Sequence, residues 1–342
     1  MKKYLIVIAA AAMLAGCAKT EVMAPDGNAP AEITFTTAPL TKALAAGQKT
    51  FSTSNVFRTY AYYTAGDFAY TASGEEFIPW TEVRHGSDDN WKTVTSYFWP
   101  KDGGCLSFFS WSLNTGALTY RDGTTPSVSF DATSGITLAD YSCTGNDDFM
   151  VADPALSKTG NESIYEHHGV PTLFHHKTAQ VKFKVKTKKA YDKDFTLTGI
   201  SFTGVSTTGT YVQGNNLTGT AAIAESWTPV ASSATTSCYS DATGMTFDEN
   251  GKDVPSNGTT IFIPQTFSSG DGKTLTVTYK IGDIAKTATV SVNSMLGGDA
   301  GVSTAFQMGK IYTVTLVFSG SEILWDPYEV DWDAAETEIE VG

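Results

Sequence analysis

The sequence predicts an all-β protein made of two β-sandwich domains in tandem, and three observations carry this prediction. Only 17% of the 342 residues are charged, while aromatic residues make up 12% and glycines number 31, a composition that suits strands and turns. Short runs of alternating apolar and polar residues are separated by turns rich in Gly, Asp and Asn. No window carries the 3.6-residue apolar stripe of an amphipathic helix. A chain of this length can bury two ordinary domain cores.

The chain begins with a short apolar leader. Lys2 and Lys3 precede an apolar run over residues 4–14 that is too short to span a bilayer. Small residues then lead into Cys17, a pattern that resembles the lipobox of bacterial lipoproteins. The resemblance implies that residues 1–16 are a signal peptide and that Cys17 carries acyl chains, which would anchor the mature protein to a membrane. An ordinary cleavable signal peptide is the alternative.

Residues 17–32 are small, polar and proline-bearing, as expected of a lipidated tether. The N-terminal sandwich is predicted over residues 33–168, beginning with a short strand in which Ile33 and Phe35 lie on one face. The loop that follows contains Lys42 and Lys49, so it is a candidate site for a trypsin-like protease, with Arg58 as a further basic position. The alternative is an ordinary first strand and linker.

Further strands of the first domain are predicted at 56–63, 96–99 and 106–113, where aromatic and β-branched residues gather between Gly-, Asp- and Asn-rich turns. The run at 106–113 alternates less cleanly than the others. Residues 142–169 have the composition of a long loop. Several short strands spaced by turns favour a sandwich.

The second sandwich is predicted over residues 169–342. Its clearest strand is 179–186, where four apolar residues alternate with one glutamine and three lysines, as in a half-buried strand with a solvated face. The same alternation returns at 275–281 and 312–318. We place the domain boundary near residue 168.

The tail, residues 323–342, alternates apolar and acidic residues, and Pro327 suits an edge or a bend. Acids interleaved with apolar residues favour an edge strand that pairs on demand. The tail is therefore a candidate donor strand, anchored by Tyr328, Val330, Trp332 and Ile339. The alternative is that it completes its own sandwich.

Taken in order, these segments resemble the fimbrillins of Bacteroidetes, the subunits of lipoprotein-derived (type V) pili. The matching segments are the lipobox at Cys17, the strand 33–37 with Thr41-Lys42-Ala43, the aromatic strand 56–63, Tyr97-Phe98-Trp99-Pro100, Leu106-Ser107-Phe108-Phe109, Asp148-Phe149-Met150-Val151-Ala152, residues 173–183, Gly209-Thr210-Tyr211, Ile263-Pro264-Gln265 and Val330-Asp331-Trp332-Asp333.

The resemblance implies two transthyretin-like sandwiches, no catalysis, and assembly with other copies or related subunits by strand exchange. It also implies that a surface protease cuts after a basic residue and removes the first strand. Lys42 matches that position best, with Lys49 and Arg58 as alternatives. The expected place is the outer membrane and the fimbrium, with adhesion or biofilm formation as the role and a host or bacterial ligand left open. A stalk, anchor or tip subunit would each fit.

Other chemistry has weaker support in the sequence. A net charge of −13 disfavours nucleic acid as a partner. The cluster of His167, His168, His175 and His176 is the only dense group of metal ligands, but neighbouring histidines in a strand point to opposite faces. The acidic turn 248–253 lacks the regular ligand spacing of a calcium loop. We therefore expect no metal and no cofactor.

Three cysteines follow Cys17, without CxxC spacing, and a Cys105–Cys143 bridge is left open. No G-x-S-x-G, phosphate loop or H-E-x-x-H motif occurs, so we expect no enzyme. A glycan-binding surface lipoprotein is the alternative function. It would need an exposed platform of tryptophans, for which the candidates are Trp80, Trp91, Trp99 and Trp111.

Overall fold

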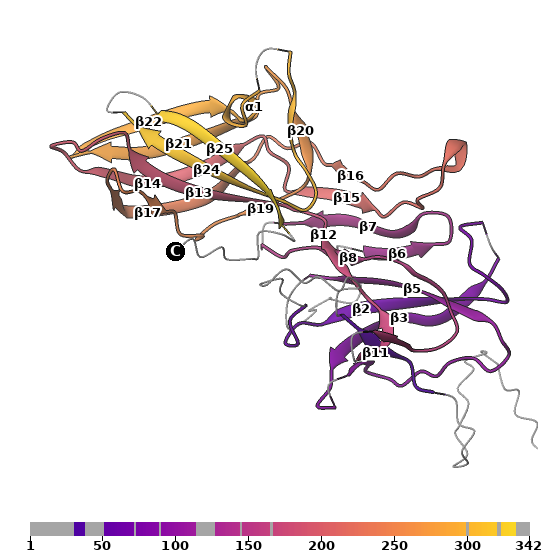
Figure 1. Ribbon diagram of the computed structural model, residues 1–342. Coiled ribbons are helices and arrows are strands. Elements are labelled where there is room, and N and C mark those ends of the chain that lie inside the picture. Colours follow the sequence, from indigo (N-terminus) through magenta and orange to yellow (C-terminus); the bar gives the residue numbers. More distant parts are fainter. Residues whose placement is uncertain are drawn as a thin grey trace, which may run out of the picture.

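The computed structural model describes residues 31–37, 51–71, 73–88, 90–113, 127–143, 146–164, 167–298, 301–319 and 323–332. These residues are folded mainly as β-strands in several sheets, which confirms the all-β prediction. Figure 1 shows two lobes, one with β2, β3 and β5 and the other with β13, β14, β21 and β24. Across the described ranges, no helix has the length and apolar character needed to cross a membrane.

The N-terminal lobe is organised around one long sheet in the order β10-β11-β1-β4-β3-β2-β5-β8-β12, with β9 beside β5. Its strands are β1 (Thr34–Thr36), β2 (Phe57–Thr64), β3 (Glu75–His85), β4 (Trp91–Thr93), β5 (Cys105–Ser112), β8 (Met150–Ala152), β9 (Ala155–Lys158), β10 (Glu162–Ile164), β11 (His167–Pro171) and β12 (Phe174–His176).

Both faces of β5, a central strand of this long sheet, are buried. Phe109 and Trp111 of β5 pack with Ile136 and Tyr211 in one core cluster, while Phe108 belongs to a second cluster. Every residue of β5 is buried. This explains why the run at 106–113 alternates poorly: a strand covered on both faces needs no polar side.

A second sheet covers one of these faces, in the order β16-β15-β7-β6. Its strands are β6 (Ser127–Asp131), β7 (Gly135–Ser142), β15 (Thr208–Val212) and β16 (Ser226–Pro229). β15 pairs antiparallel with β7, so residues 208–229 share a sheet with residues 127–142. Residues from both sides of the boundary near residue 168 therefore contribute strands to the same sheet. The division of the chain into two domains at that residue stays a prediction.

The C-terminal lobe is a sandwich of two sheets with orders β18-β13-β24-β25 and β17-β14-β21-β22; β19 also pairs with β13, and β20 pairs with β23. The elements are β13 (Ala179–Thr187), β14 (Phe195–Thr203), the 3-10 turn η1 (Gly219–Ala221), β17 (Thr235–Phe247), β18 (Lys252–Asp253), β19 (Ile261–Phe262), β20 (Gln265–Phe267), β21 (Thr274–Ile281), β22 (Ile284–Ser291), α1 (Val292–Met295), β23 (Thr304–Phe306), β24 (Lys310–Phe318) and β25 (Ile323–Asp331).

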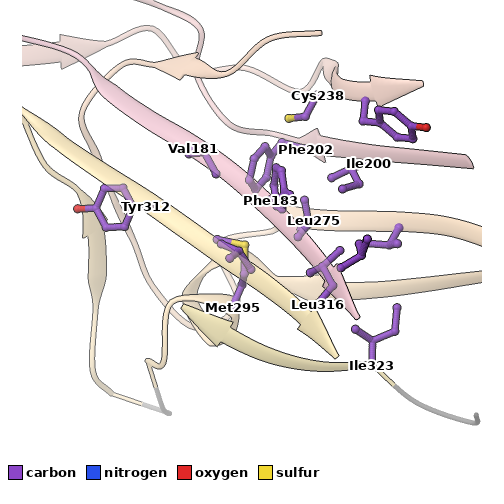
Figure 2. Close-up of a cluster of buried hydrophobic side chains, with 14 of the residues drawn as sticks. Val181, Phe183, Ile200, Phe202, Cys238, Leu275, Met295, Tyr312, Leu316 and Ile323 are labelled. Carbon is purple, nitrogen blue, oxygen red and sulfur yellow. The ribbon is translucent and has the colours of Figure 1, made fainter. Parts of the chain in front are cut away.

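The core of this sandwich follows the alternation seen in the sequence. Val181 and Phe183 of β13 and Leu316 of β24, two neighbouring strands of one sheet, point into the core (Figure 2). The ring centroid of Phe183 lies 6.1 Å from that of Phe202 on β14 in the opposite sheet. Lys182 and Lys184 lie exposed on the opposite face of β13. The prediction of a half-buried strand at 179–186 is confirmed.

Two local predictions were wrong. The segment 142–169 is not one long loop, because β8, β9 and β10 lie within it. These strands are only three or four residues long, so they leave no alternation to read; β8 and β9 pair with β5 far along the chain, and β10 pairs with the adjacent β11. Residues 96–99 form no strand and contribute an isolated bridge between Phe98 and Glu32.

Candidate functional site

The first strand, β1, lies inside the long sheet rather than at its edge. It pairs antiparallel with β4, where Phe35 is opposite Trp91, and parallel with β11, where Phe35 is opposite Val170. The side chains of Ile33 and Phe35 are 0% and 1% exposed. The predicted strand at 33–37 with its apolar face is therefore present. Its release is a separate matter that stays a prediction.

The ring of Phe35 is held by edge-on aromatic contacts. Its centroid lies 5.7 Å from that of Phe57 and 5.6 Å from that of Phe108, with interplanar angles of 82° and 88°. Such T-shaped pairs add about 0.5–1.5 kcal/mol to what burial alone contributes. Phe57 of β2 and Phe108 of β5 belong to neighbouring strands of the same sheet. If β1 were removed, they would leave a site that fits an aromatic ring.

The side-chain amide of Asn161 binds the backbone of the first strand on both its donor and acceptor sides. Its Nδ2 donates to the carbonyl of Glu32 (2.9 Å), and its Oδ1 accepts from the amide of Thr34 (3.3 Å). The indole Nε1 of Trp99 also donates to this Oδ1, at 3.0 Å. Because the contacts to the first strand are to backbone atoms, Asn161 fixes register without reading side chains.

Further backbone contacts hold the strand at both ends. The amide of Ile33 donates to the carbonyl of Tyr97, and the amide of Thr172 donates to the carbonyl of Thr36, both at 2.8 Å. Gly169 lets β11 come this close, since a Cβ there would lie 2.6 Å from the carbonyl carbon of Phe35. Gly169 also has a φ of +151°, which side chains disfavour.

Two polar side chains of the first strand have specific partners: the Thr34 hydroxyl donates to the carbonyl of His168 at 3.1 Å, and Glu32 has a corner of its own. The hydroxyl of Ser96 donates to Oε1 of Glu32 at 2.6 Å, and Nζ of Lys92 lies 3.5 Å from Oε2. Lys92 also pairs with Asp88 at 2.6 Å. The carboxylates of Asp88 and Glu32 raise the pKa of Lys92, Asp88 most strongly. The site of the first strand thus combines an apolar trough with a carboxylate-binding corner.

The tail lies in its own sheet over the residues that the structure describes. β25 pairs antiparallel with β24 along its whole length and occupies the edge position. The side chain of Tyr328 is 66% exposed, whereas Val330 is half-buried. Ile339 lies outside the described residues. In this structure residues 323–331 therefore form a paired edge strand of their own sheet. The prediction that the tail acts as a donor strand stays a prediction.

Trp332, just after β25, is fixed to the body. It is 5% exposed and stacks on the imidazole of His176, with centroids 4.2 Å apart and planes 6° from parallel. Nδ1 of His176 lies 2.5 Å from Oδ2 of the buried Asp148, whose Oδ1 accepts from the Thr178 hydroxyl at 3.0 Å. These polar groups satisfy one another beneath the indole.

Of the residues predicted for processing and lipidation, the structure describes only Arg58. Cys17, Lys42 and Lys49 lie outside the described residues. Arg58 belongs to β2, which is paired on both sides by β3 and β5. A protease needs an unpaired, accessible backbone, so Arg58 is the poorest of the three candidate cut sites.

The four tryptophans proposed as a sugar platform do not form one. Trp91, Trp99 and Trp111 are each at most 6% exposed. Trp80 is half-buried and packs between Tyr60 and Trp111. They are core residues.

The histidine and acidic clusters also serve structure. His175 binds Asp153 at 3.2 Å, which lowers the pKa of that carboxyl, while His176 binds Asp148 on the opposite face. Asp248 accepts from the amide of Asn250 within a turn. In the described part of the chain, no three His, Cys, Asp or Glu side chains gather as a metal site. Cys105, Cys143 and Cys238 are free and buried, so the Cys105–Cys143 bridge is not formed.

The chain is similar to several solved structures at low sequence identity. A candidate cell adhesion protein from Bacteroides uniformis ATCC 8492 is 17% identical, with 90% of this chain and 99% of that chain covered and a TM-score of 0.50. A fimbrial protein from Bacteroides vulgatus ATCC 8482 is 18% identical, with 81% and 92% covered and a TM-score of 0.47.

The C-terminally truncated tip fimbrial protein Mfa3 from Porphyromonas gingivalis is 12% identical, with 88% of this chain and 100% of that chain covered and a TM-score of 0.42. No curated protein matches. The sequence model of the fimbrillin-like family matches residues 41–331, which is most of the chain. This protein therefore belongs to the fimbrillin-like family of fimbrial proteins.

Proposed function

We propose that this protein is a lipoprotein-derived subunit of a cell-surface fimbrium that polymerises when its first strand is cut away and replaced by a strand from a neighbouring copy. The observation that carries the proposal is the place of β1. Three residues of strand, joined to the rest by a segment containing Lys42 and Lys49, fill an interior position of the long sheet.

Loss of this strand would leave an energetically costly gap. Full burial of Ile33 and Phe35 contributes about 1.5–3 kcal/mol each. The amide and carbonyl groups that face β1 would lose their partners as well. A strand supplied by another subunit restores both terms at once. Because donor and acceptor sites lie on different parts of the subunit, the contact is head-to-tail and propagates into a filament.

The lipobox at Cys17 gives the route to the outer membrane, where acyl chains would hold the subunit before cleavage. Cleavage at Lys42 would release the lipidated segment together with β1. The donor is drawn from the tail, for which Tyr328, Val330, Trp332 and Ile339 are the proposed anchors. Use of the first three requires β25 to separate from β24.

Limited trypsin treatment of the chain lacking residues 1–17 tests this function. We expect ladders on gels run without denaturant and a new N-terminus at Ala43. The matched variants Lys42→Gln and Lys49→Gln identify the cut: the first should remove the N-terminus at Ala43, the second should keep it, and the double variant should abolish the ladder. A cleaved chain that remains monomeric would overturn the proposal and leave a tethered, non-polymerising surface protein.

A further inference from the structure

The site of the first strand has a definite sequence preference. Reading along the strand, it takes a carboxylate at Glu32, an apolar branched side chain at Ile33, a half-buried residue at Thr34 and an aromatic ring at Phe35. The direction is fixed, because β1 runs parallel to β11 and antiparallel to β4. The pattern sought in an incoming strand is therefore Glu-Ile-x-apolar.

The sequence contains only three Glu-Ile pairs, and each is followed by an apolar residue two positions after the Ile. The first is β1 itself. The second begins β25, where Ile323 is buried in the core of the C-terminal sandwich and Trp325 packs against it. The third is Glu338-Ile339-Glu340-Val341.

We propose that Glu338–Val341 of a second copy of this chain enters the site of β1 in the register of Glu32–Phe35. This inference rests on the proposed function and names the segment, direction and register of the exchange. Ile339 takes the place of Ile33, and Val341 takes the place of Phe35. The carboxylate of Glu338 meets the Ser96 hydroxyl and the Lys92 ammonium.

The backbone contacts of the acceptor side need no adaptation to the new sequence, although the bond from the Thr34 hydroxyl to the His168 carbonyl has no counterpart at Glu340. Asn161 contacts only the backbone around Glu32 and Thr34, and the Thr172 amide contacts the carbonyl of Thr36. Any strand in this register offers the same groups. Side-chain selection is then left to the Lys92–Ser96 corner and to the apolar trough.

In this arrangement Trp332 remains with its own subunit, stacked on His176. Residues 333–337 form the connection between subunits and can span at most about 17 Å. The edge strand β25 keeps its pairing with β24, so the exchange does not require the nine-residue ladder to open. Of the four anchors proposed above, only Ile339 then crosses to the neighbour, and Tyr328, Val330 and Trp332 stay in their own subunit.

At one position the incoming segment fills the site less completely than β1 does, and the effect on subunit association can be measured. Val341 is smaller than Phe35, whose ring contacts Phe57 and Phe108. A phenylalanine at this position already fits the site, because Phe35 occupies it. Val341→Phe should therefore strengthen subunit association, by about tenfold. Ile339→Ala should weaken it by about thirtyfold or more.

Assembly of the trypsin-processed chain lacking residues 1–17 tests these effects through the protein concentration at which ladders appear. Ile284→Ala is the matched control, because the side chain of Ile284 in β22 is 56% exposed and lies outside the proposed donor and acceptor segments, and it should leave the threshold unchanged. Equal thresholds for wild type, Ile339→Ala and Val341→Phe would overturn the inference.

Register is tested by cysteine cross-linking between two variants. Lys92 lies opposite Thr34 in the ladder, so a chain with Lys92→Cys should cross-link to a processed chain with Glu340→Cys. Glu336→Cys, four residues before Glu340 on the same face of the strand, is the shifted-register control and should not cross-link. If ladders form but only the control pair, or neither pair, cross-links, the register is wrong while the proposed function stands. If wild type forms no ladder, both fail.

Discussion

The indole of Trp332 lies flat on the imidazole of His176, 4.2 Å away and within 6° of parallel. His176 belongs to β12 of the long sheet, whereas Trp332 directly follows the last strand of the C-terminal sandwich. The stack thus joins the end of the second lobe to the first. Trp332 packs in the same core cluster as Phe149 and Ile263, so its energetic role can be measured separately from assembly.

Trp332→Ala should lower the free energy of unfolding of the uncleaved chain by about 3–5 kcal/mol, because it removes a buried aromatic ring and leaves a cavity. Urea denaturation followed by far-UV circular dichroism measures this. Tyr328→Ala is the control and should change stability by less than about 0.5 kcal/mol. Equal stability of the two variants would mean that the stack contributes nothing.

Gly169→Ala should loosen the first strand selectively. The added Cβ would lie 2.6 Å from backbone of Phe35, and the φ of +151° adds backbone strain, together costing about 2 kcal/mol or more. We expect faster hydrogen exchange at the amides of β1 and faster trypsin cleavage in the segment with Lys42 and Lys49 that follows β1. Gly160→Ala is the control, since a Cβ there meets nothing within 4 Å. Identical exchange in both variants would contradict this account of β11.

Asn161→Ala should weaken the hold on both the resident and the incoming strand. It removes two bonds to the first strand and leaves the indole N–H of the buried Trp99 without this acceptor. The expected loss is about 1–3 kcal/mol of unfolding free energy, with a higher concentration threshold for ladders after trypsin. Asn146→Ala is a useful control, because that side chain binds Gly258 and Thr260 away from β1. If Asn161→Ala forms ladders at the same protein concentration as wild type, the hydrogen bonds of this amide to the strand backbone are not needed for assembly.

Local alternation made much of the fold predictable. The strand at 179–186 has one buried apolar face, and Ile33 and Phe35 form the buried apolar face of the first strand. A sequence period of two residues predicts such strands directly. β5 is covered on both faces, so its alternation is blurred although its existence is clear. β8 to β10 are too short for any period, and β8 and β9 are strands because they pair with the distant β5.

The site was predictable in its apolar half only. The alternation of Ile33 and Phe35 with polar residues predicts their buried face. Asn161 lies more than a hundred residues away from the strand that it binds, and no pattern in the sequence around it marks it as a binding residue. Glu32 gains its partners Lys92 and Ser96 through pairing of β1 with β4. The repeated Glu-Ile pair was present in the sequence, yet its meaning depends on the corner that receives the carboxylate.

The buried thiols of the body should be inert in the folded protein. Burial raises the pKa of Cys143 and of Cys238 to about 12, from an ordinary value of 9.0. At pH 8 only about one thiol in ten thousand is then a thiolate, the form that reacts with iodoacetamide. In the chain lacking residues 1–17, mass spectrometry should find neither Cys143 nor Cys238 alkylated without urea and all three cysteines alkylated in urea.

The sign of the linked stability change follows from the direction of these shifts. Because the folded-state pKa lies above the ordinary one, the thiols favour folding while both states are protonated, below about pH 9. That contribution is lost as the pH rises from about 9 toward 12, where the unfolded chain ionises and the folded chain does not. Unfolding free energies measured from pH 7 to 10 should fall less steeply in Cys238→Ala than in wild type. Rapid alkylation of Cys143 or Cys238 at pH 8 in the folded chain, or a Cys105–Cys143 disulfide in oxidised protein, would contradict the buried, unpaired state.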